Sequence, residues 1–428
     1  MLPAALFCEL YRAERIISDN WGADFISLQL FPPPMPVAAA SDASTMHPEP
    51  PIRLIKPNPP RLSALTGDLQ AIEASGRYSN YGPFNTRLEQ ALVGELFGGV
   101  GGCVTVGNAT LGLMLAIRRI VEARRTSPQK QARAYALMPA FTFAATAQAA
   151  LWCGLTPLLC DIDPVSWIAC PEAERALVEH YGEEIAVIVP CTTFGRPIDF
   201  DHYERLAGTI GAGIVIDAAA AVGTQERDGL NFGAGRRPPS VFSMHATKPF
   251  ATLEGGFIYA SDLECIDELR AMANFGFDGG RSAIMPGLNA KLNEVTAAMG
   301  LSQIGAMPEI IQKREALAQT YRALLPELSF QECNAASQAH VFLPALLPRS
   351  VQGGRDAVIR RAAEAGLEFG TYYAPHLGAQ PYFQRVCLLG ALPVTDDVSD
   401  RILSLPLHEG MTIRDVRRVA ALIKDCCR

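Results

Sequence analysis

Residues 213–221 read GIVIDAAAA: a short apolar run, then an acid, then four alanines. The run Gly213–Ile216 has the length of a buried strand. Further apolar runs of this length alternate with helical patterns along the chain, at Cys103–Val106, Ala134–Met138, Thr156–Cys160, Ala186–Pro190, Val241–Ser243 and Gly256–Tyr259. This alternation predicts an α/β fold, with a mostly parallel seven-stranded sheet flanked by helices on both faces.

Ligands of such sheets bind beyond the carboxyl ends of the strands, so the residues that follow each run are the first candidates for a site. After Cys103–Val106 comes the turn Gly107-Asn108-Ala109-Thr110, followed by a helical pattern from Leu111 to Ile120. The free N–H groups at the start of a helix can bind a phosphate. Simple helix capping is the commoner reason for such a turn.

Asp217 stands at the end of the run Gly213–Ile216, beside the small residues Ala218–Ala221. Small neighbours leave room for a flat ring to lie against the backbone. If the ring is a pyridine, the carboxylate keeps its nitrogen protonated and makes the ring an electron sink. The alternative is a strand-end aspartate that caps the next helix.

A third strand end reads Ser243-Met244-His245-Ala246-Thr247-Lys248, ahead of Glu254-Gly255-Gly256. A lysine that is partly removed from water has a lowered pKa and can form an imine. Ser243 adds a hydroxyl for the same phosphate. A phosphate loop, then an aspartate, then a lysine in this order indicates a pyridoxal phosphate site with Asp217 and Lys248 as its catalytic residues.

The remaining pattern predicts three parts. Residues 1–50 form an N-terminal extension, rich in Pro, Ala and Ser towards its end, for which disorder is one option. Residues 51–290 form a large cofactor-binding domain that begins with helices, one of them Thr86–Phe97 with Asn85 as its cap. Residues 291–428 form a smaller α+β domain, with helices over Glu294–Leu325 and Asp415–Cys426 and strands near Ala339–Leu347 and Leu367–Tyr372.

Composition narrows the classes of function. The net charge is −7, from 44 acidic and 37 basic residues, and no Lys/Arg run marks a nucleic-acid surface. The best candidate for a membrane span, Ala144–Cys160, is interrupted by Gln148 and Pro157. The 11 cysteines are scattered, without the spacing of a zinc or redox site, so we expect buried free thiols, no metal and a cytoplasmic protein.

From about Leu54 to Leu422 the chain resembles the DegT/DnrJ/EryC1/StrS family of nucleotide-sugar aminotransferases. The resemblance rests on motifs that occur in order: Asn80–Phe84, Gly107–Thr110, Pro139–Thr146, Asp161–Asp163, Phe194–Pro197, Asp217–Ala221, His245–Lys248 with Glu254–Gly256, Gly287–Glu294 and Ile402–Pro406. It implies a pyridoxal phosphate-dependent aminotransferase of fold type I.

The resemblance also implies a role for individual residues. Lys248 is the Schiff-base lysine and moves the proton, Asp217 pairs with the ring nitrogen, and Phe143 stacks on the ring. Asn108, Ala109, Thr110 and Ser243 hold the phosphate, and Asn289 reaches the cofactor of the neighbouring subunit in a homodimer with shared active sites.

Two further residues are weaker candidates for substrate binding. His376 lies in a segment that resembles the substrate-facing loop of the family, with a surface histidine as the alternative. Lys291 is a candidate for a nucleotide phosphate, with a solvated lysine as the alternative. Members usually have Gln or His where this chain has Ala220, so a polar group near the cofactor's hydroxyl is missing.

Within the family, His245–Lys248, Glu254–Gly256 and the start at Asn80–Phe84 look most like the aminotransferases that make dTDP-4-amino-4,6-dideoxyglucose. The implied reaction takes an amino group from an amino-acid donor, glutamate, to a nucleotide-linked 4-keto sugar, for surface polysaccharide or glycoside biosynthesis. The alternatives are 3-keto sugar transaminases and GDP-perosamine synthases, or a degenerate sensor protein. The related 3-dehydratases have histidine in place of the lysine, so Lys248 argues against that activity.

Overall fold

The computed structural model describes residues 50–125 and 134–428. The predicted extension therefore lies outside the described residues, apart from Pro50. The unit Glu49–Arg428 forms one compact body by its internal contacts, and the proposed division at residue 290 stays a prediction.

All seven predicted strands are present. They are β1 (Gly102–Val106), β2 (Tyr135–Pro139), β3 (Thr156–Cys160), β4 (Ile185–Ile188), β5 with β6 (Gly213–Ile214 and Ile216–Asp217), β7 (Ser240–Ser243) and β8 (Gly256–Ala260). The strand order is β1-β8-β7-β6 in one half and β11-β3-β2-β4-β5 in the other, where β11 (Leu388–Leu389) is a short edge. The strand β8 runs antiparallel to β1 and β7, and the other strand pairs of these two halves are parallel.

The backbone of residues 213–217 joins the two halves into one sheet. On one side Val215 N donates to Ile188 O (3.1 Å) and Asp217 N donates to Pro190 O (2.9 Å). On the other side Ile216 N donates to Pro239 O (2.9 Å) and Ala218 N donates to Val241 O (2.9 Å). Asp217 therefore lies at the carboxyl edge in the middle of the sheet.

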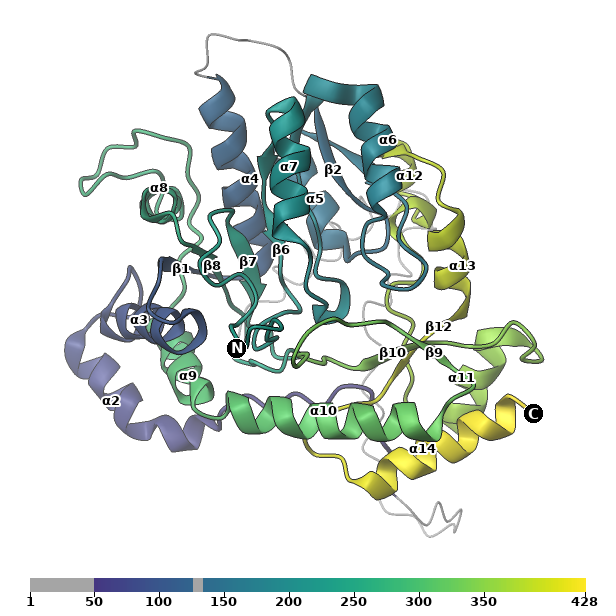
Figure 1. The fold of residues 1–428 in the computed structure, drawn as a ribbon. Coiled ribbons are helices and arrows are strands. Elements are labelled where there is room, and N and C mark those ends of the chain that lie inside the picture. The colour runs from purple at the N-terminus through teal and green to yellow at the C-terminus, as the bar shows by residue number, and fades with distance from the viewer. Residues whose placement is uncertain (1–49, 126–133) are drawn as a thin grey trace, which may run out of the picture. The chain divides into compact units, whose positions relative to one another are not determined.

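Helices cover both faces of the sheet (Figure 1). Successive strand residues point to opposite faces: Phe242 and Phe257 pack in one core cluster, and Val241 and Ile258 pack in another. The first cluster includes side chains of α3 (Pro83–Phe97), α6 (Pro171–Tyr181), α7 (Phe200–Ile210) and α9 (Glu294–Ile304). The second includes side chains of α4 (Ala109–Arg125), α5 (Ala144–Trp152) and α8 (Leu263–Met272).

The prediction that Asn85 caps a helix at Thr86 is wrong. The helix α3 begins at Pro83, whose fixed φ suits the first helical position. Asn85 lies inside the first turn and donates from Nδ2 to Thr105 Oγ1 (2.7 Å). The cap comes from far along the chain, because the buried Glu294 carboxylate accepts from Phe84 N (2.7 Å) and Asn85 N (3.0 Å).

The C-terminal part has the predicted helices and a small antiparallel sheet. The long helical pattern forms α9 and α10 (Met307–Leu324), and the last helix, α14 (Ile413–Cys426), packs beside α10 (Figure 1). The sheet order is β12-β10-β9. The other elements are β9 (Ser329–Phe330), β10 (Leu343–Leu346), α11 (Gly354–Glu364), α12 (Phe383–Val386), α13 (Pro393–Arg401) and β12 (Ile402–Leu405), with η2 (Leu62–Leu65) and α2 (Thr66–Ser75) near the start of the described chain.

The predicted strand Leu367–Tyr372 is wrong. The segment makes only isolated bridges, from Leu367 to Ile52 and from Gly370 to Ser404. After Gly370 the pairing stops, because Tyr372 N donates to the side chain of Ser404 (3.2 Å) instead of to a backbone carbonyl. The next residues then turn away from the sheet and reach the cavity described below.

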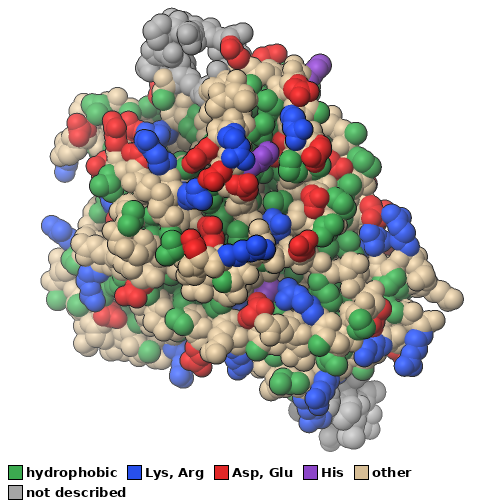
Figure 2. Space-filling model, viewed as in Figure 1, with side chains coloured by type: hydrophobic (Ala, Val, Ile, Leu, Met, Phe, Trp, Pro, Cys, Tyr) green, Lys and Arg blue, Asp and Glu red, His purple; other side chains and the backbone are tan. Residues whose placement is uncertain are grey.

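The other expectations concern cysteines and charge. Ten cysteines of the described chain are free, and six of these are buried, as expected. The face in Figure 2 carries basic and acidic side chains interspersed, without a continuous basic patch. Within residues 50–125 and 134–428, no helix is both long and apolar enough to cross a membrane.

Replacing Glu294 should destabilise the fold measurably. In Glu294→Ala the N–H groups of Phe84 and Asn85 lose their buried acceptor, at a cost of about 1–3 kcal/mol for each unsatisfied group. Urea denaturation of the cofactor-free protein should show a lower midpoint, with Glu294→Gln between this variant and wild type. The control is Glu95→Gln, an exposed position on α3; equal midpoints for Glu294→Ala and this control would contradict the capping role.

Candidate active site

A cavity of about 650 Å³ opens at the carboxyl edge of the large sheet. Its lining comes from the residues that follow β1, β2, β4, β6 and β7, which the sequence singled out as candidates. A second part of the lining, including Val341, Phe342, Tyr372 and Tyr373, comes from the C-terminal part of the chain.

Asp217 and Lys248 both line this cavity. Asp217 is 7% exposed, and burial raises the pKa of its carboxyl group. Three neighbours lower this pKa and so oppose the effect of burial. Thr146 Oγ1 donates to Oδ2 (2.6 Å), Ala219 N donates to Oδ1 (3.2 Å), and the charge of Lys248 favours the carboxylate.

Lys248 is a half-buried amine whose charge has little support. Burial lowers the pKa of Lys248, and the nearby charge of Asp217 opposes this change. Within residues 50–125 and 134–428, no hydrogen bond or ion pair holds Nζ in the charged state. An amine with a lowered pKa is neutral, and hence nucleophilic, over a wider pH range.

The end of the cavity beside α4 has free backbone donors. Asn108 Oδ1 accepts from Leu111 N (2.9 Å), so this side chain caps the helix, as the alternative reading expected. The first N–H groups of a helix have no partner inside it, and those of Ala109 and Thr110 belong to residues that line the cavity. Gly256 leaves this helix start uncovered, since a Cβ there would lie 2.9 Å from Ala109 N.

Two other predicted residues lie where the sequence expected them. Ser243 lines the cavity and its Oγ accepts from His245 N (3.3 Å). Phe143 also lines the cavity with 57% of its surface exposed, which is unusual for a phenyl ring and leaves a face for another flat ring.

Sequence reasoning missed several residues in or beside the cavity. Thr146 is one helical turn after Phe143, which was the available signal for its contact with Asp217. Phe194, Tyr372 and Tyr373 form an aromatic cluster: Phe194 stacks on Tyr373 (centroids 5.2 Å apart), which also lies edge-on to Tyr372 (6.1 Å). Only the tertiary fold brings these rings together.

Three predicted residues do not line this cavity. The exposed Asn289 pairs with Asn274, next to Ala290, whose carbonyl accepts from Gly107 N (2.7 Å). Lys291 donates to Asn274 Oδ1 (2.9 Å) and lies over the Phe275 ring (4.6 Å).

His376 lies outside the cavity as well. The alternative of a surface histidine is wrong, because its side chain is buried and contacts Asp396 Oδ1 from Nε2 (2.9 Å). The segment around His376 does face the cavity, but through Tyr372 and Tyr373. The substrate roles of His376 and Lys291 stay predictions.

The family model for DegT/DnrJ/EryC1/StrS aminotransferases matches residues 63–424. The chain belongs to this family. One relative, Protein Rv3402c of Mycobacterium tuberculosis, is 32% identical to this chain over 411 residues. The match covers 94% of this chain and 97% of that protein. The dTDP-4-amino-4,6-dideoxy-D-glucose transaminase of Escherichia coli is 26% identical over 87% of this chain and 98% of its own length.

Solved structures agree with this membership. A protein from Bacillus cereus described as a PLP-dependent aminotransferase is 33% identical, with a TM-score of 0.81 over 87% of this chain and 100% of that chain. DesI, solved with its TDP-sugar product, is 30% identical, with a TM-score of 0.77 over 89% and 93%. This DegT/DnrJ/EryC1/StrS protein is therefore an enzyme, an aminotransferase that uses pyridoxal phosphate.

The residues of the cavity fit pyridoxal phosphate. The uncovered start of α4 suits the phosphate, the open face of Phe143 suits the ring, and the buried carboxylate of Asp217 suits a protonated ring nitrogen. Ala220 lines the cavity and offers no polar side chain, which agrees with the departure noted in the DegT/DnrJ/EryC1/StrS motif.

Removing the Thr146 hydroxyl should weaken cofactor binding at mildly acid pH. The hydrogen bond from Thr146 lowers the pKa of Asp217, and such a bond to a charged group is worth about 1.5–3 kcal/mol. In Thr146→Val the pKa of Asp217 should rise further, so the carboxylate is lost at a higher pH as the solution is acidified. As the pH is lowered, the affinity for pyridoxal phosphate, measured by equilibrium binding, should therefore begin to fall at a higher pH than in wild type.

Thr146→Ser, which keeps the hydroxyl, is the control and should follow wild type. If Thr146→Val retains the cofactor down to the same pH as Thr146→Ser, the hydroxyl does not support the carboxylate.

Proposed function

We propose that this enzyme transfers an amino group from L-glutamate to a nucleotide-linked 4-keto-6-deoxy sugar. The observation that carries the proposal is the pairing of Lys248 and Asp217 in one cavity beside an uncovered helix start. The substrate class is supported by the E. coli relative, named as a dTDP-4-amino-4,6-dideoxy-D-glucose transaminase, and by DesI, which was solved with a TDP-sugar product. The product is an amino-deoxy sugar.

Each residue has a proposed task. Pyridoxal phosphate, when bound, supplies a carbonyl that carries the amino group and a ring that accepts electrons. Lys248 holds the cofactor covalently and, when released, its neutral amine moves a proton between donor and acceptor positions. Asp217 keeps the ring nitrogen protonated, Phe143 packs on the ring face, and Ala109, Thr110 and Ser243 hold the phosphate.

We further propose a homodimer with shared active sites. Asn289 and Lys291 lie outside the cavity of their own chain, in a segment with the exposed apolar side chains Phe275, Ile284 and Leu288. A second copy packed on this segment would cover these side chains. Asn289 and Lys291 of one copy would then lie beside the cofactor and substrate bound by the other copy. In a single chain, Phe275, Ile284 and Leu288 stay exposed to solvent, and exposed apolar side chains that lie together are typical of a protein–protein interface.

The first test examines Lys248. Wild-type enzyme loaded with pyridoxal phosphate should show a visible absorption band, and borohydride reduction followed by peptide mass mapping should locate the cofactor on Lys248. Lys248→Ala should lose the band, and amination of dTDP-4-keto-6-deoxyglucose with glutamate should fall by at least about 10²–10⁴-fold, the span of general acid–base catalysis.

Lys424→Ala, on the exposed side of α14, is the matched control and should behave as wild type. Cofactor found on another lysine would overturn the role of Lys248. A wild-type enzyme that binds the cofactor at Lys248 but aminates no nucleotide-linked keto sugar would leave an aminotransferase with a different acceptor.

A further inference from the structure

Two residues of the C-terminal part, Val341 and Phe342, line the cavity from a segment that is not in a sheet. Residues 338–342 have no regular secondary structure, and β10 begins only at Leu343. Phe342 nevertheless takes part in the aromatic cluster, because it stacks on Tyr372 (centroids 4.9 Å apart) and lies edge-on to Phe194 (5.5 Å). Side chains from elsewhere must hold this backbone in place.

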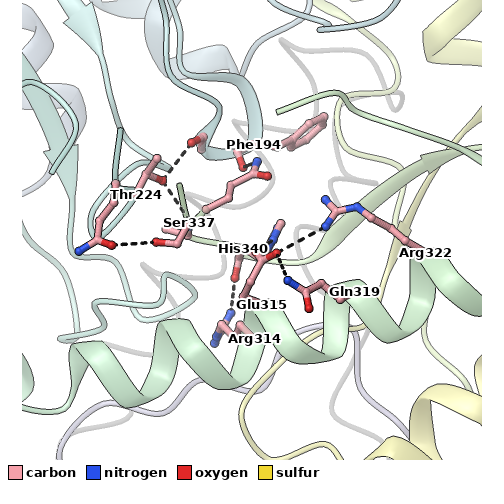
Figure 3. Close-up of polar contacts among 12 residues, drawn as sticks. Phe194, Thr224, Arg314, Glu315, Gln319, Arg322, Ser337 and His340 are labelled. Carbon is pink, nitrogen blue, oxygen red and sulfur yellow. Dashed lines mark hydrogen bonds and ion pairs between the residues drawn. The ribbon is translucent and has the colours of Figure 1, made fainter. Parts of the chain in front are cut away.

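Arg314 holds the segment from the side of α10. It is 3% exposed, and its Nη1 donates to the carbonyls of His340 (2.7 Å) and Val341 (3.2 Å). The other edge of the guanidinium is bound by Glu409, which accepts from Nε (2.9 Å) and pairs with Nη2 (2.7 Å). Figure 3 shows Arg314 pointing from its helix towards His340.

Thr224 holds the same segment from the side of the large sheet. Its Oγ1 accepts from Ala339 N (3.0 Å) and donates to Gly195 O (3.0 Å). Next to it, Gln338 Nε2 donates to Phe194 O (2.9 Å). These contacts join the segment to the loop that carries Phe194, another residue of the cavity lining (Figure 3).

His340 makes a third contact through its ring. Nε2 lies 2.8 Å from Glu315 Oε2, and Gln319 and Arg322 surround the other oxygen of that carboxylate (Figure 3). Arg322 lies 3.8 Å from Glu315 and, in the part of the chain that the structure describes, makes no hydrogen bond with a carbonyl of residues 338–342. The two arginines of α10 therefore differ: Arg314 binds the backbone of residues 338–342 directly, and Arg322 does not.

We propose that Arg314 and Thr224 are positioning residues for the acceptor, because they fix the segment that presents Val341 and Phe342 to the cavity. The identity of the acceptor rests on the proposed function. Arginine suits this task, since its planar fork presents several donors at fixed angles and a lysine ammonium cannot reproduce them. Neither residue touches the start of α4, Asp217 or Lys248, so the cofactor end should not depend on them.

The kinetic test separates acceptor binding from the rest of the reaction. In Arg314→Lys and in Thr224→Val, the KM for dTDP-4-keto-6-deoxyglucose should rise about 10-fold, and kcat should change less than about 3-fold. A more mobile segment 338–342 weakens binding of the acceptor but removes no reacting group. Pyridoxal phosphate affinity should stay at the wild-type value. The matched controls are Arg322→Lys on the same helix and Thr224→Ser, which keeps the hydroxyl; both should behave as wild type.

A second measurement needs no turnover. With 4-fluorophenylalanine placed at position 342 alone, the ¹⁹F signal should be one narrow line in wild type and in both controls, and should broaden or split in Arg314→Lys and Thr224→Val. The proposal requires both results: a raised KM with an unchanged ¹⁹F signal, or a changed signal with an unchanged KM, overturns it. If Arg314→Lys does not fold, Thr224→Val against Thr224→Ser carries the same test.

The two proposals can fail separately. If wild type does not aminate the keto sugar, the proposed acceptor is wrong, and the positioning role of Arg314 and Thr224 is judged by the ¹⁹F signal alone. An unchanged signal in both variants then overturns the positioning role.

Discussion

Asp217 is a carboxylate that folding removes almost completely from water, opposite an amine, Lys248, that folding also partly buries. Burying either charge is costly, and their mutual attraction offsets only part of that cost. The neighbouring elements supply the rest: the start of α5 brings Thr146 to one carboxylate oxygen, and the turn after β6 brings Ala219 N to the other. The central position of residues 213–217 in the sheet makes both contacts available.

The cavity combines two structural sources with different tasks. The strand ends of the large sheet supply Asp217 and Lys248, to which we assign the chemistry, and both belong to short motifs on rigid elements. The C-terminal part supplies an aromatic and aliphatic wall, which includes Val341, Phe342, Tyr372 and Tyr373. That wall is irregular backbone, and buried polar contacts from α10 and from Thr224 take the place of a strand ladder. The guanidinium of Arg314 can be buried there because the Glu409 carboxylate and the carbonyls of His340 and Val341 accept its hydrogen bonds.

Helix starts illustrate how local signals compete with tertiary contacts. Asn85 has the residue type of a cap, yet Pro83 begins the helix and Glu294, about 200 positions later, satisfies its free N–H groups. Asn108 also has the residue type of a cap and does cap its helix. The two asparagines cannot be told apart by their own neighbourhoods, because the difference lies in a carboxylate that only the fold delivers.

The sequence by itself determined the seven strands of the sheet, the cavity at its carboxyl edge, and Asp217, Ser243, Lys248, Phe143 and the turn at Gly107–Thr110 as parts of one site. Apart from Phe143, which only the resemblance to the family indicated, these follow from apolar runs of strand length and from the rule that parallel strands end at a common edge. Only the tertiary structure decided that His376 is buried against Asp396, that Tyr372 and Tyr373 reach the cavity in its place, and that Arg314 and Thr224 hold the opposite wall. The physical reason is that these contacts join residues tens to hundreds of positions apart, and no periodicity in the chain records which side chain meets which carbonyl.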